Sequence, residues 1–77
     1  MKICCDPKYN IAYIKVRAKS AEVETLRISD EINIDITPDG KIYGIELLNA
    51  NEQLEFEKKK ELVFVNEMTG QKAELHI

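Results

Sequence analysis

Three residues in one segment carry side chains that could do chemistry together. They are the carboxylates of Asp35 and Glu46 and the phenol of Tyr43. A carboxylate removed from water has a raised pKa and can exchange protons with a bound molecule. Glu46 with Asp35 and Tyr43 is therefore the candidate polar site, and we assign no residue a catalytic role.

The other reactive side chains do not form a site of recognisable spacing. Asp39 lies near Asp35 in the sequence, but its place in a turn explains it, and no further ligands accompany the two. Cys4 and Cys5 are neighbours that point to opposite faces of a strand, so they cannot easily bridge each other. We expect reduced thiols, one packed as a small hydrophobe, and a surface position for His76. No metal and no cofactor is expected.

Composition narrows the class of protein. Seventy-seven residues suffice for one domain, 1–77, and its small core needs a supplement such as self-association. A formal charge of −3 opposes binding to phosphate backbones, and a chain without Trp offers little stacking surface to nucleic acid. No signal-peptide pattern and no membrane-length apolar run is seen. We expect a cytoplasmic protein that binds neither nucleic acid nor membranes.

The element that must position the candidate site is a β-hairpin from Ile32 to Leu48. Isoleucines at 32, 34 and 36 alternate with polar residues, as in a strand with one buried face. The turn Thr37-Pro38-Asp39-Gly40-Lys41 follows, in which Gly40 can adopt the positive φ that closes a bulged hairpin. Residues 42–48 form the return strand.

A three-residue loop at 38–40 sets the register of this hairpin. Counting outward gives the pairs Ile36–Ile42, Asp35–Tyr43, Ile34–Gly44, Asn33–Ile45 and Ile32–Glu46. The return strand is then apolar on both sides, which is typical of a central strand covered on both faces. Glu46 is the exception, because this register points it toward the isoleucine side.

Three interpretations of Glu46 stay open. It could be a desolvated carboxylate used for acid–base chemistry. It could be paired with Arg17 or Arg27 at a sheet edge or a subunit boundary. Finally, a β-bulge could turn it to solvent.

Alternating segments predict further strands around this hairpin. A first hairpin combines residues 2–5 and 11–17, another strand covers 24–29, and residues 62–65 and 72–77 form a C-terminal hairpin (about 61–77). Residues 50–56 fit a short helix capped by Asn49, although their alternation also fits a strand. Lysines 58–60 are interpreted as a linker. The predicted fold is mainly β: an antiparallel meander of about five to seven strands, curled into a small sandwich or open barrel, with at most one short helix.

Several short motifs occur in order between Cys5 and Ala50. They are Asp6-Pro7, Ala12-Tyr13-Ile14, Glu24-Thr25, Ile32 to Asp35, Asp39-Gly40 and Gly44-Ile45-Glu46-Leu47-Leu48-Asn49-Ala50. Their order resembles a prokaryotic family of short proteins, the domain of unknown function 2283 family, and the last motif is the most specific. Cys5 stands where that family usually has an aromatic residue, and the segment from Glu57 onward has no clear counterpart. The resemblance implies a small β-rich domain (a core of about 5–50) and leaves its activity open.

Three hypotheses of function follow. The first is a non-enzymatic protein-interaction or self-associating module, expected as a homodimer or with a protein partner, because strand edges and the two-sided return strand need cover. The second is a small-ligand-binding protein or weak enzyme centred on Glu46. The third comes from the resemblance alone: family genes look like partners of small toxin-like proteins, which implies an antitoxin-like partner of a small basic toxin.

Overall fold

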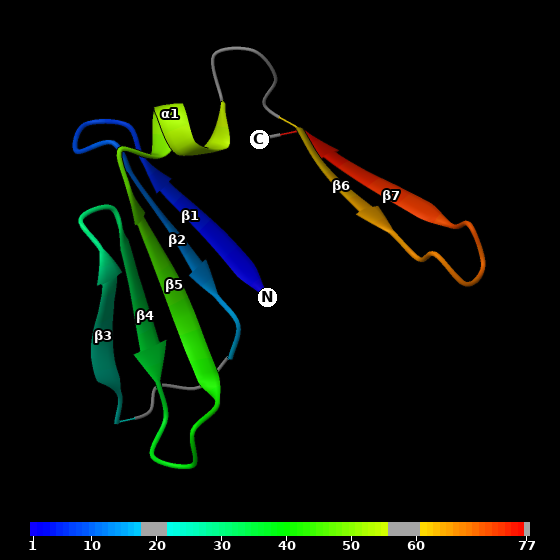
Figure 1. Ribbon diagram of the computed structural model, residues 1–77. Coiled ribbons are helices and arrows are strands. Elements are labelled where there is room, and N and C mark those ends of the chain that lie inside the picture. Colours follow the sequence, from blue (N-terminus) through cyan, green and yellow to red (C-terminus); the bar gives the residue numbers. More distant parts are fainter. Residues whose placement is uncertain (18–21, 56–60, 77) are drawn as a thin grey trace.

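The computed structural model describes residues 1–17, 22–55 and 61–76 (Figure 1). Seven strands and one short helix follow in the order β1 (Lys2–Asp6), β2 (Ile11–Lys15), β3 (Glu24–Ser29), β4 (Ile32–Ile36), β5 (Ile42–Leu48), α1 (Ala50–Leu54), β6 (Glu61–Val65) and β7 (Lys72–His76). All strand pairs are antiparallel, and the described strands do not close into a barrel. The predicted fold class is confirmed, while the predicted linker 58–60 and the last residue of the predicted C-terminal strand lie outside the described residues.

The first five strands form one sheet in the order β1-β2-β5-β4-β3 (Figure 1). Its order is not sequential, because β5 lies between β2 and β4 and brings the first hairpin beside the second. Strands β6 and β7 form a separate two-stranded sheet. Figure 1 shows this hairpin standing apart from the five-stranded sheet.

The turn between β4 and β5 has the predicted chemistry. Gly40 adopts a φ of 83°, and its N–H donates to the carbonyl of Thr37 at 2.9 Å. The N–H of Thr37 donates to the carbonyl of Lys41 at 2.9 Å, which closes the three-residue loop. The Thr37 hydroxyl also donates to the carboxylate of Asp39, and this bond lowers the pKa of Asp39. The turn therefore accounts for Asp39 without any further role.

Beyond that turn the register differs from the predicted one. Ile36 pairs with Ile42 as expected, but a bulge follows and leaves Tyr43 without a partner on β4. The remaining pairs are Asp35–Gly44, Ile34–Ile45, Asn33–Glu46 and Ile32–Leu47. The prediction that Glu46 faces the isoleucines is wrong, because one extra residue in a strand moves every later side chain to the other face.

The bulge separates the sheet into two chemically distinct faces. One row of direct partners crosses all five strands and is aliphatic: Ile3, Ile14, Ile45, Ile34 and Leu26. We call the side of the sheet that carries this row the apolar face. The opposite, polar face carries the row Cys4, Tyr13, Glu46, Asn33 and Arg27. The expectation of a return strand apolar on both sides is therefore wrong for residues 44–47, which alternate between the two faces once the bulge is included, whereas Leu48 lies on the polar face.

Helix α1 sits at one end of the sheet and contacts β2 (Figure 1). It confirms the helical interpretation of residues 50–56, although it ends at Leu54. Asn49 occupies the N-cap position with a φ of 52° and makes no capping bond to the backbone. Asn10 does this instead: its side-chain oxygen accepts the N–H of Asn51 at 2.8 Å. The helix start is thus held by a residue from the turn between β1 and β2.

Little of the described chain is buried. Ala12 (0% exposed) and Ala50 (3%) are its buried hydrophobic residues, and none of the larger described side chains is fully enclosed. Cys4 and Cys5 are both free and exposed. The expectation that one thiol is packed is wrong for the single chain, because both cysteines lie on β1, an edge strand, and both are exposed.

Candidate functional site

Tyr13 lies at the centre of the polar face. Its hydroxyl donates a hydrogen bond of 2.7 Å to Oδ2 of Asp35, two strands away. The hydroxyl of Thr25 donates to the other oxygen, Oδ1, at 2.6 Å. Asp35 thus joins strands β2, β4 and β3 through both of its carboxylate oxygens.

Gly44 makes this crossing possible. Tyr13 is diagonal to Gly44 on the neighbouring strand, and its side chain extends over the glycine toward Asp35. A Cβ built on Gly44 would lie only 2.9 Å from Cε1 of the Tyr13 ring and closer still to its Cζ and hydroxyl. The glycine of the Gly44-to-Ala50 motif is therefore needed for the close approach of a ring, since a side chain there would occupy the same space.

Glu46 lies on the polar face and has a partner. The side-chain amide of Asn33, its direct neighbour on β4, donates to Oε1 of Glu46 at 2.9 Å. The bulge interpretation of Glu46 is correct in that the side chain leaves the isoleucine side. The arginine interpretation is wrong for Arg27, whose guanidinium bonds Asp30 at 2.5 Å.

Tyr43 is the residue that the bulge leaves unpaired. The amino group of Lys15 lies 5.6 Å from the centroid of its ring, within the range of a cation–π contact. The structure therefore places Asp35, Tyr43 and Glu46 around Tyr13, but Asp35 bonds Tyr13 rather than Tyr43. The sequence predicted Tyr13 only as part of a strand and of the motif Ala12-Tyr13-Ile14. The sequences of strands β2 and β5 contain no local pattern that would have shown these two strands to be neighbours.

The polar network has one clear electrostatic consequence. Burial, followed by the hydrogen bond to Asp35 and the negative charge of that carboxylate, raises the pKa of the Tyr13 phenol. Each effect favours the neutral phenol, which can donate, over the phenolate, which cannot. Tyr13 therefore acts here as a hydrogen-bond donor that ties strands together.

This raised pKa predicts how stability depends on alkaline pH. In the unfolded chain a tyrosine ionises near a pKa of about 10, and in the fold the pKa of Tyr13 is higher. The stabilisation is fully present below pH about 10 and is lost as the pH rises from there through the folded value. We expect urea unfolding to show a free energy that falls above pH about 10, and a shallower fall in Tyr13→Phe. Tyr9→Phe is the matched control, and equal pH slopes for wild type and Tyr13→Phe would contradict this assignment.

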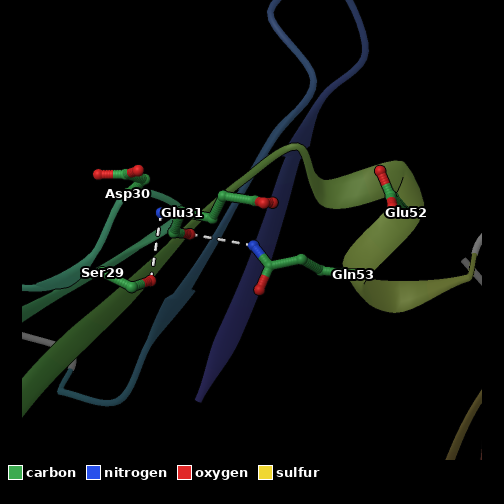
Figure 2. A pocket seen from close by; sticks show the side chains of 5 residues that line it. All are labelled: Ser29, Asp30, Glu31, Glu52 and Gln53. Carbon is green, nitrogen blue, oxygen red and sulfur yellow. Dashed lines mark hydrogen bonds between the residues drawn. The ribbon is translucent and has the colours of Figure 1, made fainter.

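A hollow of about 470 Å³ lies between the β3–β4 turn and α1. Ser29, Asp30, Glu31, Glu52 and Gln53 line it, and Figure 2 shows Gln53 reaching from α1 toward the turn. Its side-chain amide donates to the carbonyl of Glu31 at 3.0 Å. None of the predicted site residues lines the hollow. The hydrogen bond from Gln53 to Glu31 connects helix α1 to the β3–β4 turn. Within the described ranges, no group of three or more His, Cys, Asp or Glu side chains could hold a metal ion.

The second candidate surface is apolar. The aliphatic row is half-buried or exposed along its whole length, and Leu26 at its end is exposed. Strand β6 adds Leu62, Val63, Phe64 and Val65, all of them exposed. The described part of a single chain therefore presents two apolar surfaces that are exposed or half-buried, a feature that marks association sites in soluble proteins.

Comparison with known proteins identifies a protein family that matches part of this chain. The family model described as "Protein of unknown function (DUF2283)" matches residues 2–51, which include the whole five-stranded sheet and the start of α1. Searches of curated proteins and of solved structures gave no match. None of the helices in the described part of the chain has the length and apolarity needed to cross a membrane. With a match over this length, the chain belongs to the DUF2283 family, whose function is not known.

Proposed function

We propose that this protein is a non-enzymatic, self-associating module whose apolar face is covered by a second copy. The observation that carries the proposal is the aliphatic row across all five strands, which no second layer of the described chain covers. A sheet with one apolar face needs a partner layer to remove that face from water. The polar face needs none, because its carboxylates already have hydrogen-bond partners.

The exposed surface of the chain is larger than that of a compact monomer, which supports association. The chain exposes 6256 Å² of accessible surface, whereas a compact monomer of 8.9 kDa exposes about 4,800 Å². The excess is about 1,450 Å² per chain, or about 2,900 Å² for a pair, which lies within the range of obligate homodimers.

Two neighbouring residues of β4 test this proposal. Ile34 belongs to the aliphatic row and Asn33 to the polar face, so Ile34→Lys and Asn33→Lys place the same charge on opposite faces of one strand. We expect light scattering to give a dimer for wild type and for Asn33→Lys. For Ile34→Lys we expect a monomer, because an interface cannot bury an unpaired ammonium without a large cost.

Circular dichroism of all three proteins serves as the folding control. The proposal fails if wild type is monomeric throughout the micromolar range. It also fails if the folded Ile34→Lys protein dimerises as tightly as Asn33→Lys, because the apolar face is then not the interface.

A further inference from the structure

The hairpin β6–β7 exposes the four apolar residues of β6. The exposed fractions of Leu62, Val63, Phe64 and Val65 run from 42% at Leu62 to 66% at Phe64. The main packing of each of these two strands is on the other, and Figure 1 shows them apart from the sheet. An isolated two-stranded hairpin is only marginally stable in water. This hairpin therefore needs a surface on which to pack.

Only one side of the hairpin is suited to burial. By register, Leu62 pairs with Leu75 and Phe64 pairs with Ala73, so these two pairs share one side. The other side carries Glu61 and the pairs Val63–Glu74 and Val65–Lys72, and each of these pairs includes an ionisable residue. We call the side defined by Leu62, Phe64 and Ala73 the hairpin face.

We infer that the hairpin face packs on the apolar face of a second copy of this chain, and that the second copy returns the contact. This inference rests on the proposed self-association and names the segment that provides the cover. The two surfaces match in length, because β6 and the strands β1, β2 and β4 each have five residues, about 17 Å of extended chain. One contact of this kind removes both unpartnered apolar surfaces from water at once.

The covalent connection favours exchange between copies. Only residues 55–60 join α1 to β6, and five of these six are charged: Glu55, Glu57, Lys58, Lys59 and Lys60. Short connections between packing units favour exchange of the unit between copies over its folding back on the same chain. The hairpin also lies beyond the segment 2–51 that matches the family model.

The alternative arrangement places the two apolar faces directly against each other. It would cover the aliphatic rows but leave Phe64 in water. Substitutions in the hairpin separate the two arrangements, since only the exchanged dimer buries the hairpin face.

The test uses full-length Phe64→Glu and, as matched control, Val63→Glu on the other side of the same strand. Sedimentation velocity is expected to show that Phe64→Glu raises the dimer dissociation constant about 100-fold or more, as for loss of a central apolar anchor. Val63→Glu should change it less than about tenfold. Circular dichroism checks that both variants keep the fold.

A mixing experiment then asks whether the hairpin reaches the other copy. Phe64→Glu has an intact apolar face, and Ile34→Lys has an intact hairpin. A mixed dimer therefore restores one wild-type contact and sets a glutamate near a lysine in the other. We expect the two variants to form dimers together at concentrations where each alone is monomeric.

The outcomes separate this inference from the proposed function. Wild type that stays monomeric contradicts both. Wild type that dimerises together with an equally dimeric Phe64→Glu keeps self-association but overturns the role of the hairpin. A Phe64→Glu protein that is monomeric, and stays so when mixed with Ile34→Lys, also overturns reciprocal docking of the hairpin on the apolar face.

Discussion

Gly44→Ala is expected to lower the free energy of unfolding by about 2 to 3 kcal/mol, which is large for the addition of one methyl group. The added Cβ would lie within 2.9 Å of Cε1 of Tyr13. The ring must then leave its position over β5, and its hydroxyl loses the bond to Asp35. Urea unfolding of both proteins measures the effect.

A double-mutant cycle assigns this cost to the ring. In a Tyr13→Ala background the space over Gly44 is open, so Gly44→Ala should cost less than about 0.5 kcal/mol. A cost that is the same with and without the Tyr13 ring would show that the backbone, and not Tyr13, requires glycine at this position.

The second large expected effect is a dependence of the free energy of unfolding on protein concentration. If the apolar face is buried in the dimer, association adds to the stability of the fold, and dilution lowers that stability. Each tenfold dilution removes about 1.4 kcal/mol from the stability of a dimer that unfolds to two separate chains. Between about 100 µM and about 1 µM we therefore expect the urea midpoint to fall by the equivalent of about 2.7 kcal/mol.

Ile34→Lys provides the control for this measurement. Its charge on the aliphatic row should remove the dependence on concentration together with the dimer. Superimposable unfolding curves for wild type at the two concentrations would mean that the single chain folds without a partner.

The sequence predicted the parts of the fold that depend on local chemistry. Alternating isoleucines and the Pro38-Asp39-Gly40 loop determine the hairpin of β4 and β5, and the pair Ile36–Ile42 was found by counting from that loop. Strand positions along the chain follow from the same alternation, which is a property of neighbouring residues.

The bulge at Tyr43 could not be located in this way. It depends on what the residues after it must face: Gly44 has to lie beneath the Tyr13 ring, and Ile45 has to join the aliphatic row. Both requirements come from β2, about thirty residues earlier in the chain. Pairing of β2 with β5 is a long-range contact, and alternation alone does not specify it.

The candidate site was also predicted only in part: its residues were predicted from local sequence, but their partners were not. Asp35, Tyr43 and Glu46 were singled out from residue type and spacing, and they lie around Tyr13 on the polar face. The partners Thr25 and Lys15 come from strands whose order alternation does not specify. Asn33 lies in the predicted hairpin, but the bulge shifts its pairing to Glu46. The unusual position of Glu46 in the predicted register was the signal of a bulge.

The most direct test of a covered apolar face is the mass of the wild-type protein by sedimentation equilibrium at about 100 µM, where a dimer of obligate size should be complete. We expect twice the chain mass of 8.9 kDa. A mass of 8.9 kDa at that concentration would contradict it, because the aliphatic row would then be stable in water without a second copy.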